Sequence, residues 1–226
     1  MGKHMNKEEF ASYIDHTGLK PDLLTTDIKK LCNEAIEYSF ASVCVNPYYV
    51  STAKEFLKYS KVKVCTVVGF PLGATTTEVK VLEASQAIKN GAAEIDMVLN
   101  IGALREKKFD YVEKEIKTIC ESCKGKAFVK VIIETCLLDN NQIIKACELA
   151  VSAGADYVKT STGFSLSGAK ESDVALMKET VGNSIGIKAS GGIKDLDSLI
   201  NMIKAGATRI GTSSSVNIMN EIDKDK

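Results

Sequence analysis

The stretch AGADYVKTSTG, residues 153–163, contains a helix stop, a short strand and a polar loop in direct succession. Gly154 is typical of a helix C-terminus, and Tyr157 and Val158 favour a strand because aromatic and β-branched residues fit a pleated sheet. The hydroxyl groups and the glycine after Lys159 predict that the strand ends in a loop. A lysine at the end of a buried strand either pairs with a carboxylate or serves as an amine nucleophile. This stretch alone favours the ion pair, because buried charges are usually paired.

Two other segments repeat the helix stop and the strand that follows it. They contain Asn90-Gly91-Ala92 and Ala205-Gly206-Ala207, and each precedes a strand by a few residues. Five positions after the three glycines stand Asp96, Lys159 and Gly211, so we expect these residues at the same height in their strands. Strands and helices alternate in roughly eight units, the number that closes a barrel. A doubly wound sheet alternates in the same way, so the repeat count favours an α/β fold of the TIM (β/α)8 type.

The expected elements follow from apolar periodicity and from glycine and proline breaks. Strands are expected over residues 14–17, 41–46, 62–70, 94–99, 128–134, 156–160, 185–189 and 208–211. Helices are expected over residues 6–13, 25–38, 53–57, 77–89, 110–122, 141–152, 171–180, 196–204 and from 214 onward. A loop is expected to open at Asn100-Ile101-Gly102. The helix over residues 6–13 is a short extra N-terminal element, because it precedes the first strand.

The opening residues Met1-Gly2-Lys3-His4-Met5 are typical of an expression-vector remnant. We therefore expect residues 6–226 to form one domain, at a length that α/β barrels commonly occupy as a single unit. Setting the remnant aside leaves His16 as the one histidine of that domain.

Charge and cysteine content limit the class of partner and the compartment. The chain has 29 basic and 29 acidic residues, and neither sign forms a block typical of nucleic-acid or membrane binding. No apolar run approaches the roughly 18 residues of a membrane span, so the expected partner is a small molecule. Seven cysteines, an odd number, are scattered through regular segments without a secretory signal. This pattern indicates a reduced cytoplasmic protein.

Strand phase predicts which charged side chains point into the barrel. In VKVIIE, residues 129–134, the helix-covered face takes the branched apolar residues, so Lys130 and Glu134 point inward. The same alternation turns Asp96 and Glu94 inward together. For Lys130 and Glu94 we expect interior ion pairing, because buried charges usually exist as pairs. Residues at the C-terminal ends of barrel strands are instead candidates for catalysis.

Asp96, Lys159 and Lys188 are the inward charges expected near that end of the barrel. Two lysines and one carboxylate cannot all be neutralised by simple pairing. A neighbouring lysine disfavours the ammonium form of Lys159 and favours the free amine, which attacks carbonyl groups to give a Schiff base. The protonated imine is an electron sink that lets a neighbouring C–C bond break or form. Asp96, directly or through a water, would shuttle the proton.

Glycine-rich turns follow the last strands. Gly191 and Gly192 come after Lys188, and GTSSS, residues 211–215, leads into the final helix. Backbone N–H groups at such loops and at a helix N-terminus commonly hold a phosphate in barrels. A serine run before a helix is equally explained as an N-cap. Together with Gly163, three turns at one end of the barrel predict a phosphate site.

The sequence predicts neither a metal nor an organic cofactor. His16 is a single histidine, too few for the usual His-based zinc sites. Cys120 and Cys123 form a lone CxxC inside an expected helix, and no Walker or dinucleotide glycine pattern is present. Cys44 ends a strand at the catalytic rim and is more typical of a packed thiol than of a nucleophile, since no histidine is placed to activate it.

Eight short motifs, each weak alone, stand in a specific order along residues 14–218. They are DHT at 15–17, VCVNP at 43–47, VGFPLGA at 68–74, EIDMV at 94–98, VKVIIET at 129–135, VKTSTGF at 158–164, KASGGI at 188–193 and RIGTSS at 209–214. In this arrangement the chain resembles the deoxyribose-phosphate aldolase family, Schiff-base aldolases with a TIM-barrel fold. The resemblance implies reversible cleavage of 2-deoxy-D-ribose 5-phosphate to D-glyceraldehyde 3-phosphate and acetaldehyde, within deoxyribose and deoxyribonucleotide breakdown.

The resemblance also implies roles for individual residues. Lys159 would form the imine, Lys188 would favour its free amine, and Asp96 would relay protons. The substrate-binding candidates are Asp15, which matches a contact to a substrate hydroxyl, Cys44 and Thr162. The phosphate-binding candidates are Gly163, Gly191, Gly192, Gly211, Ser213 and Ser214. Gly18, Lys194 and Ser215 replace a usual leucine, arginine and glycine, and we expect the last two departures to affect phosphate affinity more than chemistry.

Two other functions stay open. A phosphate-binding barrel isomerase or epimerase would move a proton with Asp96 and a second acid, without a covalent intermediate. A non-catalytic sugar-phosphate-binding barrel would hold Lys159 in a simple ion pair with Asp96. Neighbouring lysines disfavour both alternatives, because neither needs an amine beside an ammonium. The expected partner is a sugar phosphate in every case. Since barrel enzymes often pair, a homodimer or higher homo-oligomer is an open expectation for which the sequence identifies no surface.

Overall fold

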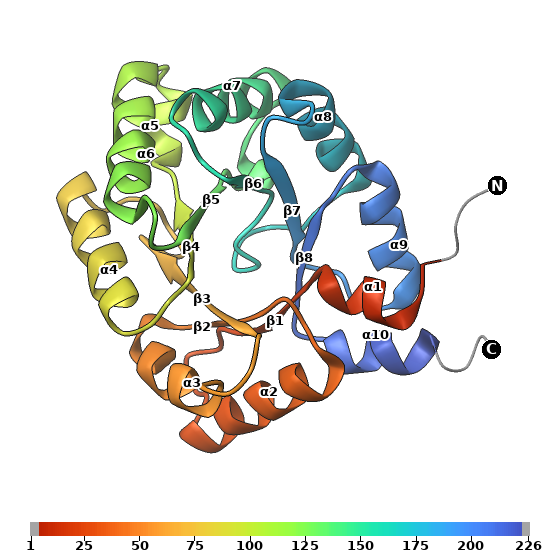
Figure 1. Ribbon diagram of the computed structural model, residues 1–226. Helices are drawn as coiled ribbons and strands as arrows, with labels where there is room; N and C mark the ends of the chain where they lie inside the picture. Colours follow the sequence, from red (N-terminus) through yellow and green to blue (C-terminus); the bar gives the residue numbers. More distant parts are fainter. Residues whose placement is uncertain (1–4, 223–226) are drawn as a thin grey trace.

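Eight parallel strands close into a barrel in chain order, and helices form a ring around it (Figure 1). The computed structural model describes residues 5–222. The strands are β1 (Ile14–Gly18), β2 (Ser42–Val45), β3 (Lys63–Val68), β4 (Glu94–Val98), β5 (Phe128–Ile132), β6 (Tyr157–Lys159), β7 (Gly186–Ser190) and β8 (Arg209–Thr212). The predicted TIM (β/α)8 barrel is confirmed. Of the expected vector remnant, residues 1–4 lie outside the described part of the chain.

Helices connect the strands along the outside of the barrel. They are α1 (Lys7–Ser12), α2 (Thr25–Tyr38), α3 (Val50–Phe56), α4 (Thr77–Lys89), α5 (Ile101–Arg105), α6 (Phe109–Cys123), α7 (Asn140–Ser152), α8 (Glu171–Val181), α9 (Leu196–Ala205) and α10 (Ser215–Ile222), with 3₁₀ turns η1 (Pro47–Tyr49) and η2 (Thr135–Leu137). The extra N-terminal helix is α1, as predicted, and it packs beside α10 (Figure 1). Over residues 5–222, none of these helices combines the length and the apolar character that a membrane crossing requires.

The loop expected at residues 100–102 was wrong, because α5 begins there. Asn100 caps this helix: its side-chain oxygen accepts a hydrogen bond from Ala103 N at 3.0 Å. An asparagine in this position satisfies one of the free N–H groups at a helix start. A helix of five residues is little more than one turn, so the sequence contains no periodic apolar pattern that would indicate it.

Helix ends follow the glycine stops that the sequence repeats. Gly91, Gly154 and Gly206 stand at the ends of α4, α7 and α9, with φ angles of 105°, 80° and 119°. A positive φ is accessible to glycine without the steric cost that a Cβ brings. The next strand begins a few residues later in each case, so the repeated spacing fixes where β4, β6 and β8 start.

The strand register arranges the inward side chains in layers drawn from alternate strands. Cys44 is in register with Cys65, and Cys65 with Glu94. Because barrel strands are tilted, the residue at the same height two strands away lies two positions further along the chain than the residue in register. The upper layer, nearest the strand C-termini, is Cys44, Asp96, Lys159 and Gly211. The middle layer is Asp15, Cys65, Lys130 and Lys188, and the lower layer is Ser42, Glu94, Tyr157 and Arg209. The equal height expected for Asp96, Lys159 and Gly211 is thus confirmed.

The main apolar core lies between the barrel and the helix ring. Val129, Val131 and Ile133 point into it, as strand phase predicts, and each is at most 1% exposed. The barrel interior is different, because charged side chains fill much of it. Its small apolar cluster is made of Leu19, Cys44, Cys65 and Val67.

The connection from β3 to α4 passes close to the end of β4. Gly73, in this connection, has a φ of 67°, and a Cβ at this position would lie 2.1 Å from the Leu99 carbonyl oxygen. Gly125, between α6 and β5, has a φ of 71°, and such a Cβ would meet no atom within 4 Å. The two glycines therefore share a left-handed backbone and differ in the space around them.

We expect Gly73→Ala to lower the free energy of unfolding more than Gly125→Ala does. Both variants carry the cost of a left-handed Cβ, about 1–2 kcal/mol. Only Gly73→Ala adds overpacking against Leu99, which costs about 1–3 kcal/mol more. Urea denaturation of the two variants measures the difference. Equal losses would contradict the close approach of this connection to β4.

Candidate active site

Asp96 accepts hydrogen bonds from three lysine ammonium groups inside the barrel. Lys159 Nζ lies 2.8 Å and Lys188 Nζ 2.7 Å from its Oδ2 atom. The structure thus brings the three predicted catalytic residues together. Lys130 Nζ lies 2.8 Å from Asp96 Oδ1 and 2.5 Å from Glu94 Oε2. The expected pairing of Lys130 with Glu94 is confirmed, and the contact of Lys130 with Asp96 is an addition that the sequence did not indicate.

Asp15 and Arg209 complete the charge cluster. Arg209 Nη1 lies 2.7 Å from Asp15 Oδ1 and 3.2 Å from Glu94 Oε2. Lys188 Nζ lies 2.5 Å from Asp15 Oδ2. Arg209 was not singled out from the sequence, although strand phase could have found it. It stands two residues before Gly211 on β8 and therefore points inward as well.

The cluster holds more cations than carboxylates. Its acids are Asp15, Glu94 and Asp96, and its cations are Lys130, Lys159, Lys188 and Arg209. Among these residues, Lys130, Lys188 and Arg209 each contact two carboxylates or more. Lys159 contacts Asp96 alone and shares that oxygen with Lys188. The ammonium charge of Lys159 is therefore the least compensated of the four.

The contacts keep Asp96, Asp15 and Lys188 in their charged forms. Burial raises the pKa of Asp96, but the three lysines outweigh burial and hold that pKa well below its ordinary value. Burial also raises the pKa of Asp15, and the cations around it, Lys188 first, bring that pKa below its ordinary value. Burial lowers the pKa of Lys188, but the charges of Asp15 and Asp96 outweigh it and raise that pKa above its ordinary value. At neutral pH, Lys188 is an ammonium and Asp96 a carboxylate.

A cleft of about 750 Å³ reaches Lys159 from the C-terminal ends of the strands. Within the described charge cluster, Lys159 is the one member that lines it. Thr162 and all six predicted phosphate-binding residues line the same cleft: Gly163, Gly191, Gly192, Gly211, Ser213 and Ser214. Lys20, Lys30 and Lys194 add positive charge to its wall. The amine of Lys159 and the glycine-rich turns therefore share one cavity.

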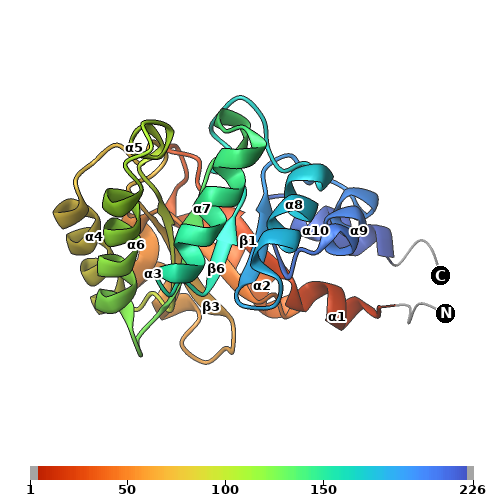
Figure 2. The ribbon, with the colours of Figure 1, turned by 90° about the horizontal axis from the view of Figure 1, so that it is seen from above.

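The side view places the segments around this cleft at one end of the barrel. In Figure 2, α5, which follows β4, and the loop from β6 to α8 lie on the same side of the barrel. In a closed parallel barrel this side carries the C-terminal ends of all strands, where barrel enzymes hold their catalytic residues.

Asp15 and Cys44 lie beneath the cleft. Both are fully buried, and neither is among the described residues that line it. Besides its cation contacts, Asp15 accepts a hydrogen bond from Ser42 Oγ at 2.7 Å. Cys44 packs in the small apolar cluster of the barrel, as expected of a packed thiol. The roles of Asp15 and Cys44 as substrate contacts stay predictions.

Two sets of buried acids and thiols have ligand atoms close enough together for a metal ion. They are Cys44-Cys65-Asp96 and Asp15-Cys65-Glu94. An ammonium group reaches both sets, because Lys130 Nζ lies 3.4 Å from Cys65 Sγ, 2.8 Å from Asp96 Oδ1 and 2.5 Å from Glu94 Oε2. A metal cation would meet this like charge, so these residues do not fit one. In the CxxC of α6, burial raises the pKa of Cys120 to about 12, which disfavours the thiolate that a metal requires.

His16 contacts the end of the last predicted phosphate-binding turn. Its Nδ1 lies 3.0 Å from Ser215 Oγ, and its Nε2 lies 2.9 Å from Glu34 Oε2. Ser215 begins α10 and Glu34 belongs to α2, so the ring ties the turn to a neighbouring helix. Burial lowers the pKa of His16, and the contact with Glu34 opposes this shift only in part. No local sequence pattern indicates this contact, because 199 residues separate His16 from Ser215.

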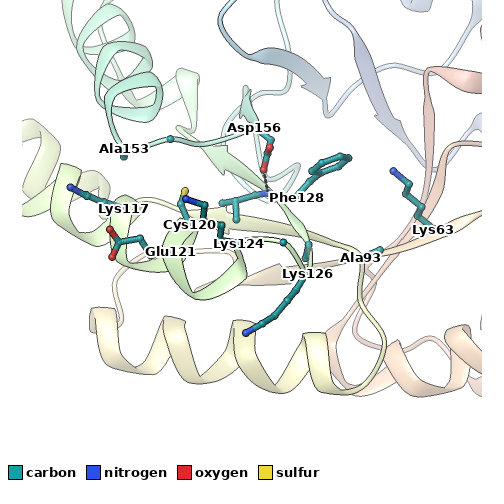
Figure 3. Close-up of a pocket in the computed structure, with 14 residues that line it drawn as sticks. Lys63, Ala93, Lys117, Cys120, Glu121, Lys124, Lys126, Phe128, Ala153 and Asp156 are labelled. Carbon is teal, nitrogen blue, oxygen red and sulfur yellow. Dashed lines mark hydrogen bonds between the residues drawn. The ribbon is translucent and has the colours of Figure 1, made fainter.

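A second hollow, of about 740 Å³, lies at the opposite end of the barrel (Figure 3). Figure 3 shows Lys117 and Lys126 pointing in different directions, both away from Phe128. Lys63 Nζ lies 4.6 Å from the centre of the Phe128 ring and 3.7 Å from Glu94 Oε1. These lysines do not converge on one point, and barrel enzymes place their chemistry at the other end. The hollow is therefore not the candidate active site.

Comparison with known proteins identifies the family. The sequence profile described as DeoC/LacD family aldolase matches residues 9–221. The chain belongs to the DeoC/LacD aldolase family. This aldolase, a carbon–carbon lyase, is 60% identical over 213 residues to the deoxyribose-phosphate aldolase of Geobacillus sp. (strain WCH70), covering 94% of this chain and 96% of that protein.

Two further relatives agree. The deoxyribose-phosphate aldolase of Caldicellulosiruptor saccharolyticus is 59% identical to this aldolase over 219 residues, covering 96% of this chain and 100% of that protein. The structure of deoxyribose phosphate aldolase from Aeropyrum pernix, described as a unique tetramer, superposes with a TM-score of 0.91. That protein is 33% identical, and the match covers 98% of this chain and 94% of that one.

We expect the free energy of unfolding of the aldolase to fall as the pH drops from about 6.5, the value for an unfolded histidine, toward the lowered pKa of His16. In this window the unfolded chain binds more protons than the folded protein, so acid favours unfolding. One histidine contributes a slope of at most about 1.4 kcal/mol per pH unit. His16→Gln removes the titrating group, and urea denaturation of both proteins between about pH 5 and 7 isolates its contribution. Parallel curves for the two proteins would argue against a buried neutral His16.

Proposed function

We propose that this aldolase reversibly cleaves 2-deoxy-D-ribose 5-phosphate to D-glyceraldehyde 3-phosphate and acetaldehyde through a Schiff base on Lys159. The position of Lys159 carries the proposal: it is the least compensated cation of the cluster and the member that lines the cleft. An amine nucleophile needs both access to a carbonyl and a low cost of losing its proton. The choice of substrate is supported by relatives at 57% and 60% identity that are named deoxyribose-phosphate aldolase.

The amine of Lys159 attacks C1 of the open-chain sugar, and loss of water gives a protonated imine. A base removes the proton of the C3 hydroxyl and the C2–C3 bond breaks. Its electron pair enters the imine and forms an enamine, while C3 becomes the aldehyde carbon of glyceraldehyde 3-phosphate. Protonation of the enamine at C2 and hydrolysis by water release acetaldehyde and restore the amine.

Asp96 and Lys188 lie where protons are transferred during this reaction cycle. Oδ2 of Asp96 receives hydrogen bonds from both lysines, at 2.8 Å from Lys159 and 2.7 Å from Lys188. A proton that leaves Lys159 passes to Asp96 or to a water beside it. Lys188 remains an ammonium and lies beside the amine of Lys159, because both lysines contact the same oxygen of Asp96.

The sugar phosphate extends from Lys159 along the cleft to the glycine-rich turns. Gly163, Gly191 and Gly192 have φ angles of 85°, 84° and 80°, conformations in which backbone N–H groups can face an anion without an intervening Cβ. The N-terminus of α10 adds further N–H donors and a favourable dipole. Lys194 supplies positive charge on the same wall.

An isomerase or epimerase without a covalent intermediate is the alternative. It would require Asp96 to take a proton from a substrate carbon. Asp96 is fully buried and is not among the described residues that line the cleft, so it does not reach a substrate carbon. A non-catalytic barrel would not require a fourth cation in the charge cluster. The position of Lys159 at the cleft therefore supports the aldolase reaction over both alternatives.

We also infer the setting in which the aldolase works. Its seven cysteines are free thiols, the state expected in the reducing cytoplasm. Cleavage of deoxyribose 5-phosphate belongs to the breakdown of deoxyribose and deoxyribonucleotides. The tetramer described for the Aeropyrum pernix relative supports a homo-oligomeric assembly.

Borohydride reduction in the presence of acetaldehyde is expected to trap a covalent adduct on Lys159, because reduction converts an imine into a stable secondary amine. Peptide mass analysis locates the modified lysine. Lys159→Met should abolish trapping and lower kcat/KM by several orders of magnitude. Lys117→Met, at the opposite end of the barrel, serves as the control and should leave both unchanged. Finding Lys159 unmodified in folded protein would refute the Schiff-base proposal.

Lys188→Leu is expected to shift the pH profile of acetaldehyde trapping to higher pH. Leucine removes the ammonium that shares Asp96 Oδ2 with Lys159, so this oxygen is left to pair with Lys159 alone. Lys188→Arg keeps the charge and should keep the profile. Circular dichroism must show that the leucine variant is folded, because removing one partner of a buried pair costs about 3–5 kcal/mol. An unchanged profile in a folded leucine variant would remove Lys188 from this role.

A further inference from the structure

Glu134 is a buried carboxylate that the proposed chemistry does not use. It is 2% exposed and lies between the end of β5 and η2. Its carboxylate accepts hydrogen bonds from Thr162: Thr162 N lies 3.2 Å from Oε1 and 3.3 Å from Oε2, and Thr162 Oγ1 donates to Oε2. A carboxylate on the end of one strand thus holds the loop that follows the next strand.

The backbone of Glu134 departs from the regular sheet. Ile133 N donates to Lys159 O at 3.0 Å, and Thr135 N donates to Thr160 O at 2.9 Å. Between these two hydrogen bonds the segment at the end of β5 advances by two residues and the segment at the end of β6 by only one. A regular parallel ladder advances equally on both strands. Glu134 is therefore the extra residue of a β-bulge. Bulges beside active sites re-aim side chains.

The backbone of Glu134 adopts a conformation that is more typical of glycine. Its φ of 55° and ψ of 65° lie in the left-handed region, which a residue with a Cβ adopts at a cost. Glycine would adopt the same conformation freely. A glutamate here is therefore accounted for by what its carboxylate does, and its observed hydrogen bonds point to the loop that contains Thr162.

Thr162 connects the carboxylate of Glu134 to the wall of the cleft. Its Oγ1 accepts a hydrogen bond from Phe164 N at 3.1 Å and closes a tight turn around Gly163. All three residues of this turn line the cleft, whereas Glu134 is not among the described lining residues. On the other side, Ser190 Oγ donates to the backbone of the same loop at 2.6 Å. The turn is thus held between the end of β5 and the end of β7.

We propose that Glu134 is a positioning residue that sets the turn at residues 162–164 for the phosphate end of the substrate. The inference rests on the proposed function, because it takes the turn around Gly163 to be part of the phosphate site. Glu134 acts through Thr162 and touches neither the amine nor the substrate. Lys159 precedes the bulge, and its backbone contact with Ile133 does not involve the carboxylate. Loss of the carboxylate should therefore weaken recognition of the phosphorylated sugar and spare the chemistry of the amine.

Glu134→Gln tests this separation. An amide keeps the shape of the side chain but has one acceptor oxygen in place of two, and its NH₂ group cannot accept from Thr162. We expect KM for 2-deoxyribose 5-phosphate to rise about tenfold or more, the effect of losing a hydrogen bond to a charged group. We expect kcat to change little, and acetaldehyde, which carries no phosphate, to be trapped by borohydride at the wild-type rate. Glu148→Gln, an exposed glutamate on α7, is the matched control and should change neither quantity.

Thr162 supplies an independent variant should Glu134→Gln not fold. Thr162→Val removes the hydroxyl and should reproduce the rise in KM, and Thr162→Ser restores the hydroxyl and should recover most of the affinity. Combined with Glu134→Gln, Thr162→Val should add no further rise, because both act on one contact.

Two results would overturn the role of Glu134. One is an unchanged KM in folded Glu134→Gln. The other is a fall in kcat and in acetaldehyde trapping at constant KM, the signature of a merely structural residue. Failure of wild-type protein to be trapped at all would instead refute the proposed function, so the two proposals fail by different measurements.

Discussion

The organisation of the barrel interior depends on one carboxylate, Asp96, that accepts from three ammonium groups. A buried carboxylate is stable only with such partners. Without it, the repulsion between the three ammonium groups would be uncompensated. The two oxygens of this carboxylate are not equivalent, because Oδ1 accepts a hydrogen bond from Lys130 and Oδ2 accepts from both Lys159 and Lys188. Sharing one oxygen leaves the amine at the cleft weakly neutralised. The packing of the charges thus distinguishes Lys159 from the other cations of the cluster.

The layers explain how these charges reach one another. Interior positions of TIM barrels are usually filled with branched apolar residues. Here each of the three layers contains an acid beside a base, so a charge finds partners in its own layer as well as in the layer above or below. Asp15 and Glu94 help to compensate the cations lower in the barrel, and Asp96 is the carboxylate that contacts Lys159 at the end where the cleft opens. The same arrangement fixes the rotamers around the amine, as a preorganised site requires.

Much of this site could be predicted from the sequence, and the reason is periodicity. Repeated helix stops gave the shared height of Asp96 and Lys159, and strand phase turned both inward. Periodicity predicts the direction in which a side chain points but not the distance to its partner. It therefore did not show that Lys130 contacts three carboxylates or that Arg209 contacts Asp15. The bulge at Glu134 escaped detection for a different reason. A left-handed glutamate carries no local signature, because the position is held by contacts with a loop 28 residues away.

Gly211 occupies the fourth position of the upper layer, beside Cys44, Asp96 and Lys159. It contributes no side chain, and a Cβ there would lie 3.0 Å from Lys188 Cε. The stem of Lys188, which belongs to the middle layer, therefore lies against the position that a side chain would take. By this path the ammonium group of Lys188 comes within 2.7 Å of Asp96 Oδ2 in the upper layer. A larger residue in place of Gly211 would push Lys188 away from the oxygen that it shares with Lys159.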